Sequence, residues 1–345
     1  MRPVVVVESN IPAVPDALSD DFDVRRIAPE DITPGTVRDA DALIVRTRTR
    51  CDGGLLAGSR VRLVGTATIG TDHIDAEWCA RNGIRTVSAP GCNAPAVAQY
   101  VLSAILQLHP DDYRSRRLAV VGVGHVGTLV ERLARALGMD TMAVDPPRAE
   151  AEPENEWHTI EEAAQEADII TFHTPLTRRG DYPTFHLADE NFFGSLRRPV
   201  TFINSARGPV TDTAALLKAI GNGRVAHAVI DCWEGEPDIS PELLELADVA
   251  TPHIAGYSLQ GKIRATNAML RALSGEFGTP LRQVPLPVAR QADAGSDAPD
   301  VLAEALRGSY NPGGDDTRAL KEHPERFEQL RNSYNLRFEP VIFND

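Results

Sequence analysis

Short apolar runs alternate with polar or helical segments along the first 95 or so residues of this 345-residue chain. The runs that predict strands are VVVVE, DVRRI, ALIVRT, RLVGTA and RTVSA. One segment between them, AEWCARNG, ends at Gly83, and a glycine commonly follows the last turn of a helix. Strands that alternate with helices in this way are typical of a parallel α/β sheet.

A second and clearer α/β series runs from about residue 97 to 255, with predicted strands LAVVGV, TMAVD, DIITFH, VTFIN, HAVID and VATPH. Apolar residues at 126, 129, 130, 133, 134 and 137 have helical spacing, and Gly138 follows them. Thr159 with Glu162 predicts a capping box for the next helix. Asp212 predicts an N-cap before TAALLKAI.

The chain closes with a linker rich in proline, alanine, aspartate and glycine, PLPVARQADAGSDAPD, and a terminal piece from about residue 300 to 345. The terminal piece is predicted to be helical at DVLAEALRG and around ERFEQLRNSY. It is too short to bury much core alone, so we expect it to pack on the main body or on a second subunit.

Charge and hydropathy narrow the classes of partner. The formal net charge is −14, with 49 acidic residues against 35 arginines and lysines, and an acidic surface argues against a nucleic-acid partner. No apolar run approaches the roughly 20 residues of a membrane helix. The N-terminus, MRPVVVVESN, lacks the long apolar core and cleavage site of a signal peptide. We therefore expect a cytoplasmic protein that has no membrane partner.

The four cysteines give no sign of a metal or disulfide site. Cys51, Cys79, Cys92 and Cys232 have no CxxC spacing and no neighbouring histidine pairs. They predict neither a zinc site nor a disulfide framework, and buried free thiols with no metal are the simpler interpretation.

A glycine-rich turn stands at the start of the second series. VVGVGHVG places Gly122, Gly124 and Gly127 as G-x-G-x-x-G, after an apolar strand and before an amphipathic helix. In that context the glycines let the backbone approach a pyrophosphate, which the free N–H groups of the helix N-terminus bind. The alternative is a glycine-rich turn in an ordinary βαβ unit.

The next strand ends at Asp145, which lies 18 residues past Gly127. An acid at about this spacing accepts hydrogen bonds from the adenosine ribose and repels a 2′-phosphate. The spacing favours NAD over NADP as the cofactor, whereas Arg148 nearby would suit the 2′-phosphate of NADP.

Three later motifs each place a polar residue after a predicted strand: Arg207 in FINSARGPVTD, Glu236 in VIDCWEGEP and His253 in VATPHIAGY. The carboxyl ends of strands line the ligand crevice of an open α/β sheet, so we expect these side chains to converge. Together they suit the oxidation of a 2-hydroxy acid. Neutral His253 is the base, Glu236 holds its other ring nitrogen, and Arg207 binds the carboxylate. Singly, each also has a simpler interpretation as a surface arginine, a turn glutamate or a capping histidine.

The order Arg-Gly, Gly-Glu-Pro and Pro-His-Ile-Ala-Gly resembles the D-isomer-specific 2-hydroxyacid dehydrogenases. The resemblance is denser to one branch of that family and covers about residues 1 to 270. The stretches that carry it are VGTATIGTDHID, APGCNAPAVAQYV, FHTPLTRRGDYPTFHLADE, DCWEGEPDISPELL and PHIAGYSLQGKIRAT. ERFEQLRNSY faintly resembles the dimerisation domain of that branch. Where the branch has a glutamate in AVAEYV, this chain has Gln99.

The resemblance implies an activity and an architecture. The activity is NAD-dependent oxidation of 4-phospho-D-erythronate to (R)-3-hydroxy-2-oxo-4-phosphooxybutanoate, in pyridoxal 5′-phosphate (vitamin B6) biosynthesis, by a homodimer. The fold is α/β, with two Rossmann-like or flavodoxin-like parallel-sheet domains, an active-site cleft and a small C-terminal α+β dimerisation piece. The implied domains are 1–96 with 256–284 for the substrate, 97–255 for NAD, and 285–345 for the linker and dimerisation.

By motif match, the resemblance assigns Arg207, Glu236 and His253 to the active site, with His253 as proton donor and acceptor. The residues implied to contact NAD are Asp145, Thr174, Asp231 and Gly256, together with His125 and Val126 in the glycine-rich turn. The residues implied to contact the substrate are Thr47, Thr68 and Tyr257. A terminal phosphate also needs positive charge beyond Arg207, and Arg46 in VRTRTR is a candidate, its alternative being a solvated arginine at a strand end.

Two other functions stay open. Another D-2-hydroxyacid dehydrogenase, such as one acting on 3-phosphoglycerate, would have the same fold and triad and a different substrate pocket. A non-catalytic NAD(H)-sensing protein would keep the cofactor site, since a fold does not fix a function. A sensor has no need of Arg207, Glu236 and His253 together, so their presence disfavours it.

Overall fold

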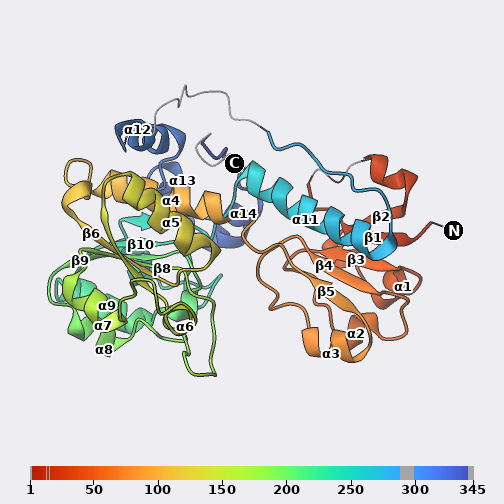
Figure 1. The fold of residues 1–345 in the computed structure, drawn as a ribbon, viewed down its shortest axis with the longest axis horizontal. Coiled ribbons are helices and arrows are strands. Elements are labelled where there is room, and N and C mark those ends of the chain that lie inside the picture. The colour runs from red at the N-terminus through yellow and green to blue at the C-terminus, as the bar shows by residue number, and fades with distance from the viewer. Residues whose placement is uncertain (1, 13, 15, 288–298, 341–345) are drawn as a thin grey trace. The chain divides into compact units, whose positions relative to one another are not determined.

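The computed structural model describes residues 2–12, 14, 16–287 and 299–340. The chain divides into two compact units, which we describe separately (Figure 1). The first comprises Met1–Asn93 and Ser258–Val288, and the second comprises Ala94–Tyr257 and Ala289–Asp345. Each unit is built around one parallel sheet.

The first unit has a five-stranded parallel sheet in the order β2-β1-β3-β4-β5. Successive residues of a strand point to opposite faces, so Val5 and Val7 pack on one side of the sheet and Val6 on the other. Helix α11 covers the first side, and α1, α2 and α3 cover the second. The elements are β1 Val4–Glu8, η1 Asp16–Asp20, β2 Asp23–Ile27, η2 Pro29–Asp31, α1 Pro34–Val37, β3 Ala42–Val45, α2 Gly53–Leu56, β4 Leu63–Thr66, α3 Ala76–Arg81, β5 Arg85–Val87 and α11 Leu259–Phe277.

The second unit has a six-stranded parallel sheet in the order β11-β10-β9-β8-β6-β7. Chain order reverses at β6, which lies between β7 and β8, and ligands of open α/β sheets bind at such a point. The strands are β6 Arg117–Val121, β7 Asp140–Val144, β8 Ile169–Phe172, β9 Val200–Asn204, β10 Val225–Ile230 and β11 Val249–Ala250. The α/β class with two parallel sheets is therefore confirmed.

The strands of the second sheet are buried on both sides, because helices cover both of its faces. Helices α4 and α5 lie on one face and α7 to α10 on the other. The capping box of Thr159 with Glu162 and the N-cap at Asp212 are confirmed. The helices are α4 Ala94–Leu108, η3 Tyr113–Ser115, α5 His125–Ala136, α6 Pro146–Ala151, α7 Ile160–Glu166, α8 Glu190–Ser195, η4 Gly208–Val210, α9 Thr213–Gly221 and α10 Pro241–Leu246.

The C-terminal segment, defined here as residues 299–340, packs on the second unit. Leu306 of α12 is fully buried against α4, and Phe327 of α14 is buried in the core under the opposite face. The segment contributes helices: α12 Pro299–Ser309, α13 Asp315–Glu322, η5 Pro324–Arg326 and α14 Phe327–Asn332. Most of the predicted linker, residues 288–298, lies outside the described residues.

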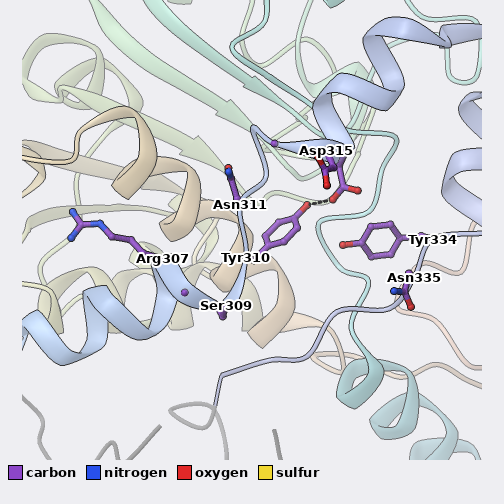
Figure 2. Close-up of a pocket in the computed structure, with 10 residues that line it drawn as sticks. Arg307, Ser309, Tyr310, Asn311, Asp315, Tyr334 and Asn335 are labelled. Carbon is purple, nitrogen blue, oxygen red and sulfur yellow. Dashed lines mark hydrogen bonds between the residues drawn. The ribbon is translucent and has the colours of Figure 1, made fainter. Parts of the chain in front are cut away.

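The C-terminal segment also lines a surface pocket of about 530 Å³ (Figure 2). The hydroxyl of Tyr310 donates to the Asp316 carboxylate at 2.7 Å, and the guanidinium of Arg337 lies 4.4 Å from the centre of the Tyr310 ring. Burial raises the pKa of Asp316. These contacts fix α12 and α13 to the strand-like residues that follow α14. Among the described residues, no helix has the length and apolar character needed to cross a bilayer.

Candidate active site

The glycine-rich turn that follows β6 depends on two glycines. Gly122 has φ +91°, and an added Cβ would lie 2.7 Å from the Thr174 nitrogen. A Cβ on Gly127 would lie 2.0 Å from the Gly122 oxygen, so α5 is pressed onto the turn. Gly124 is the N-cap of α5, and a Cβ added to it would have no atom within 4 Å. The turn therefore presents an open backbone surface at the helix N-terminus, where His125 and Val126 begin the first turn.

Two buried hydroxyls at the carboxyl ends of neighbouring strands have no hydrogen-bond partner among the described residues. Thr174 follows β8 and Ser205 follows β9, and the Oγ atoms of both lack a hydrogen bond in the described part of the chain. Buried polar groups are nearly always paired, so orphaned hydroxyls at the carboxyl edge of a sheet are expected where a polar ligand binds. Ser205 was not among the predicted site residues.

Asp145 lies at the end of β7, as predicted, and its carboxylate contacts the glycine-rich turn. It accepts from the Val123 N–H at 2.8 Å and from the Arg148 N–H at 3.1 Å. The guanidinium of Arg148 donates to the Val123 carbonyl at 2.7 Å and pairs with Glu152 at 2.6 Å. Because Arg148 already has these partners, it is poorly placed to bind the 2′-phosphate of NADP.

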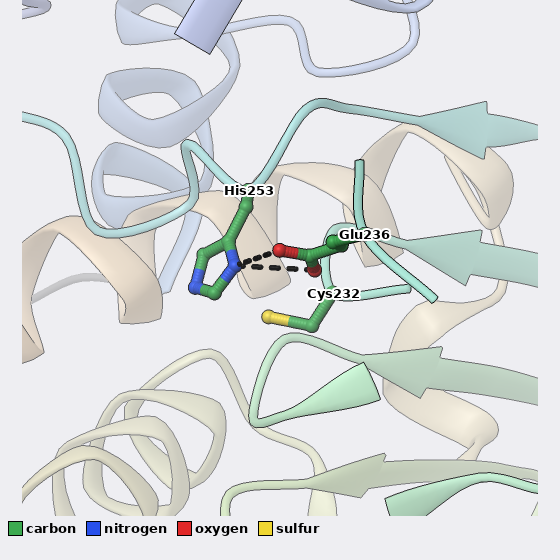
Figure 3. A group of neighbouring side chains, drawn as sticks. All are labelled: Cys232, Glu236 and His253. Carbon is green, nitrogen blue, oxygen red and sulfur yellow. Dashed lines mark hydrogen bonds and ion pairs between the residues drawn. The ribbon is translucent and has the colours of Figure 1, made fainter. Parts of the chain in front are cut away.

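His253 and Glu236 form a hydrogen-bonded pair (Figure 3). His253 Nδ1 lies 2.9 Å from Glu236 Oε2, and the Nε2 atom points away from the carboxylate. Glu236 also accepts from the Trp233 N–H at 2.7 Å. Burial raises the pKa of Glu236, but the hydrogen bond and charge of His253 and the Trp233 N–H lower it by more, so the pKa lies below its ordinary value. The pair therefore leaves Nε2 as the ring nitrogen for proton exchange.

The backbone of His253 is strained and is held by Asp231. His253 has φ +56°, a conformation that typically costs about 1–3 kcal/mol outside glycine. Its N–H donates to the Asp231 carbonyl at 2.9 Å. The Asp231 carboxylate, 1% exposed, accepts from the N–H groups of Ile254 at 2.7 Å and Ala255 at 3.0 Å, and from Thr251 Oγ1 at 2.7 Å. Burial raises the pKa of Asp231. The side-chain oxygens of this predicted NAD contact thus bind the turn that carries His253.

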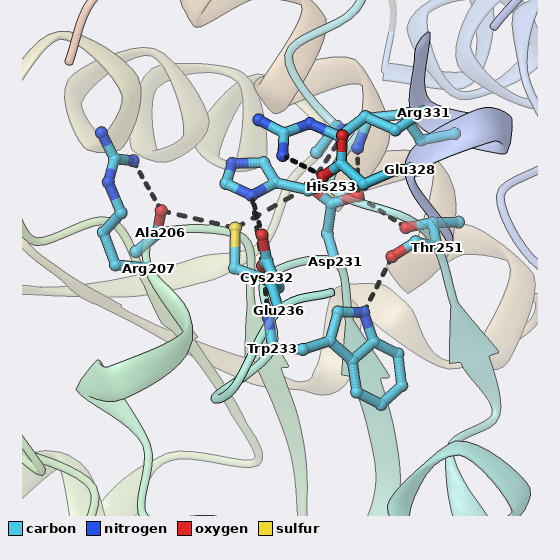
Figure 4. A network of polar contacts seen from close by, with 12 residues as sticks. Ala206, Arg207, Asp231, Cys232, Trp233, Glu236, Thr251, His253, Glu328 and Arg331 are labelled. Atoms are coloured by element: carbon cyan, nitrogen blue, oxygen red, sulfur yellow. Dashed lines mark hydrogen bonds and ion pairs between the residues drawn. The ribbon is translucent and has the colours of Figure 1, made fainter. Parts of the chain in front are cut away.

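Arg207 follows β9, and its loop is packed on the loop that carries Glu236. A Cβ on Gly208 would lie 1.9 Å from the Trp233 oxygen, so the two backbones touch at that glycine. Cys232 Sγ lies 3.4 Å from the Ala206 carbonyl, and Arg207 donates to the same carbonyl at 2.8 Å (Figure 4). The loops after β9, β10 and β11 therefore bring Arg207, Glu236 and His253 to one edge of the sheet.

Cys232, Glu236 and His253 also have the spacing of a metal site, since one ligand atom of each lies within 4.8 Å of the others. Burial raises the pKa of the Cys232 thiol well above its ordinary value. Glu236 and His253 already bind each other, and this pair has the geometry for proton transfer at the free Nε2 atom.

Two arginines of the C-terminal segment reach this site, and the sequence patterns missed both. Arg337 is buried and donates to the carbonyls of Ile254 at 3.0 Å, Tyr257 at 3.0 Å and Ala255, all on the turn after His253. Its Nε donates to Gln99 Oε1 at 3.1 Å, so the glutamine that departs from the family pattern helps to hold this arginine.

Arg331 lies on α14, beside His253 and Glu236 in Figure 4. Burial lowers its pKa, but Tyr257, Glu236 and Glu328 raise it by more. Its charge therefore acts on Glu236 and on the predicted substrate residue Tyr257. No local motif marks either arginine, because both act on residues about 75 or more positions earlier in the chain.

The other predicted residues divide between the two units. Gly256 and Tyr257 complete the turn after His253, with the Tyr257 N–H donating to the Ile254 carbonyl at 2.8 Å. Thr47, Thr68 and Arg46 belong to the first unit. Thr68 Oγ1 lies 2.6 Å from Thr66 Oγ1, and the Arg46 N–H donates to Glu8 at 2.8 Å. The Nε of Arg46 is buried without a partner among the described residues.

The chain is similar to known proteins over nearly its whole length. The family model described as D-isomer specific 2-hydroxyacid dehydrogenase, NAD binding domain, matches residues 99–255. Erythronate-4-phosphate dehydrogenase of Bacteroides thetaiotaomicron is 44% identical over 99% of this chain and 98% of its own. The enzyme of the same name from Marinobacter nauticus is 40% identical over 97% of this chain and 92% of its own.

Solved structures share the fold. D-lactate dehydrogenase from Aquifex aeolicus, complexed with NAD and lactic acid, superposes with a TM-score of 0.64 at 24% identity, covering 80% of this chain and 95% of that one. The TT0316 protein from Thermus thermophilus superposes with a TM-score of 0.66 at 25% identity, covering 82% and 99%.

The close contact at Gly208 predicts that a side chain at this position destabilises the folded protein. Gly208→Ala places a Cβ against the Trp233 carbonyl, so it should lower the free energy of unfolding by about 1–3 kcal/mol, as overpacking commonly does. The control is Gly221→Ala at the end of α9, where nothing lies within 4 Å and no loss is expected. Urea denaturation measures both variants. Equal stability of the two would contradict the contact.

The burial of His173, which favours the neutral imidazole, predicts that the free energy of unfolding depends on pH. Burial lowers the pKa of His173 from 6.5 to about 3, so the unfolded chain takes up this proton first as the pH falls. The stabilisation is complete above about pH 6.5 and is lost toward pH 3, with a slope near pH 5 of about 1.4 kcal/mol per pH unit. His173→Gln should remove that slope from the unfolding free energy. His323→Gln, at an exposed position, should leave it unchanged.

Proposed function

Since the chain belongs to the D-isomer specific 2-hydroxyacid dehydrogenase family, in the branch of the erythronate-4-phosphate dehydrogenases, we propose that it oxidises 4-phospho-D-erythronate with NAD. The product is (R)-3-hydroxy-2-oxo-4-phosphooxybutanoate, and the pathway is pyridoxal 5′-phosphate (vitamin B6) biosynthesis. The observation that carries the chemistry is the His253–Glu236 pair beside Arg207, at the carboxyl edge of the sheet. The identity over nearly the whole chain carries the choice of substrate.

In this proposal His253 is the group that transfers the proton. Glu236 binds Nδ1 and so places the ring proton there, which leaves the Nε2 lone pair for the substrate hydroxyl. Nε2 takes the proton from the C2 hydroxyl as the C2–H bond breaks and the C2=O bond forms. The carboxylate of Glu236 then stabilises the imidazolium at 2.9 Å. NAD, when bound, accepts the hydride that leaves C2.

Arg207 holds the carboxylate of the substrate. One of its terminal nitrogens is fixed by the Ala206 carbonyl, and this orients the planar fork at the edge of the sheet. A guanidinium binds a carboxylate through two parallel hydrogen bonds, and it also polarises the C2 oxygen as the carbonyl forms. The same group would hold the 2-oxo acid in the reverse direction.

The residues of the second unit suit NAD. The open backbone at Gly124, with His125 and Val126, suits the pyrophosphate, and the orphaned Thr174 hydroxyl suits a polar group of the cofactor. The Asp145 carboxylate suits the ribose. The predicted contact at Gly256 lies on the turn after His253. For Asp231 we propose a positioning role, because its carboxylate is taken up by that turn.

The first unit, with its continuation after residue 257, is proposed to bind the substrate through Thr47, Thr68 and Arg46, together with Tyr257 of the second unit. We also propose that the protein is cytoplasmic and a homodimer, with the C-terminal segment at the dimer interface. These last assignments rest on the family resemblance.

The test of function is NADH formation with 4-phospho-D-erythronate, beside 3-phospho-D-glycerate and unphosphorylated D-erythronate. A parallel series with added 2-oxo acid reoxidises any tightly held cofactor. We expect a preference for 4-phospho-D-erythronate of more than about tenfold, which corresponds to 1.4 kcal/mol in the transition state. Preference for 3-phosphoglycerate would reassign the substrate and keep the chemistry. No turnover with bound NAD would favour a sensor.

His253→Ala tests the mechanism. Loss of a general acid–base typically costs about 10²–10⁴-fold, so kcat should fall by that factor while NAD binding persists. The matched control is His323→Ala, an exposed histidine of the C-terminal segment, which should keep full activity. An unchanged kcat in His253→Ala would remove His253 from the reaction.

A further inference from the structure

The proposed substrate carries two anionic groups, a carboxylate and a phosphate, and the protein itself has a net charge of −14. Binding a small polyanion to an acidic protein requires local positive charge. Arg207 accounts for the carboxylate, and Arg46 of the first unit is the phosphate candidate named above. A cation of the second unit close to the His253–Glu236 pair would act on the same phosphate.

Arg331 lies at that position. Phe327, one helical turn earlier on α14, is 1% exposed and buried in the core of the second unit, and residues four apart share a helix face. This anchor directs Arg331 toward the site. In the view of Figure 4 the guanidinium group of Arg331 is drawn next to the His253 ring, with Arg207 on the other side of the ring.

The surroundings of Arg331 suit an anion site. Its side chain is 21% exposed, so it is partly desolvated while still open to solvent. It hydrogen-bonds Tyr257, the residue that the family resemblance assigns to the substrate. Its ion-pair partner is Glu328, three residues earlier on the same helix at 3.3 Å, and that carboxylate is 46% exposed. Because the Glu328 carboxylate is open to solvent, a phosphate can compete with it for the Arg331 guanidinium.

We propose that Arg331 is a substrate-binding residue that recognises the phosphate of the substrate together with Tyr257. Together with Arg207 and His253, the site then has a carboxylate-binding arginine, a base and a phosphate-binding arginine. The C-terminal segment thereby determines specificity for phosphorylated hydroxy acids. This inference rests on the proposed function.

The test compares kcat/KM of Arg331→Gln on 4-phospho-D-erythronate and on D-erythronate. Loss of a charge-assisted hydrogen bond should raise KM for the phosphorylated substrate by about 10- to 100-fold, with a much smaller effect on D-erythronate. Arg331→Lys should recover part of the loss. Arg326→Gln, which removes an exposed arginine just before the same helix, should change neither substrate. Equal losses on both substrates, or no loss, would overturn the proposal.

A second readout does not depend on turnover. Inorganic phosphate is titrated calorimetrically into the NAD-loaded wild type and into Arg331→Gln, with thermal unfolding to verify that both are folded. Phosphate should bind the wild type and bind the variant at least about tenfold more weakly. If the wild type binds phosphate but oxidises no substrate, the proposed function fails and Arg331 stands as an anion site. Equal phosphate binding by both proteins would exclude Arg331.

Discussion

The turn that carries His253 is held between two buried side chains of opposite charge. On one side the Asp231 carboxylate accepts the N–H groups of Ile254 and Ala255. On the other side the Arg337 guanidinium donates to the carbonyls of the same two residues and of Tyr257. The peptide groups of one short turn thus bridge an acid and a base that lie deep in the protein. Removal of either side chain would leave buried peptide groups of the turn unpaired, and an unsatisfied buried polar group typically costs about 1–3 kcal/mol.

Much of the site follows from that arrangement. The left-handed backbone of His253 persists because the turn is fixed from both sides, and the ring is thereby set against Glu236. Glu236 is in turn fixed by the Trp233 N–H, and the Trp233 carbonyl abuts Gly208 beside Arg207. A tightly packed backbone, with glycine where no side chain fits, therefore connects the three polar residues. Their relative positions depend little on flexible side chains.

The fold was largely predictable from the sequence because its signals are local. Strands and helices followed from apolar periodicity, and the caps at Thr159 and Asp212 followed from residues three or fewer positions away. Arg207, Glu236 and His253 were predictable because a parallel sheet places the ends of its strands together. Arg331 and Arg337 were not, since the residues of the site that they contact lie on distant elements and no period relates them. The contacts of the Asp231 carboxylate were not predictable either, because a motif shows that an acid is present and not which groups it binds.

The contacts of Arg337 also bear on how the protein is made. Synthesis proceeds from the N-terminus, and the sheet of the second unit is complete once β11 has left the ribosome. Arg337 follows 87 residues after the end of β11, so the carbonyls of the His253 turn have no guanidinium partner until residue 337 has been synthesised. The strands of the second unit can therefore pair before the His253 turn gains its contacts with Arg337. A chain that stops short of residue 337 would keep the sheet and leave the carbonyls of Ile254, Ala255 and Tyr257 without this donor.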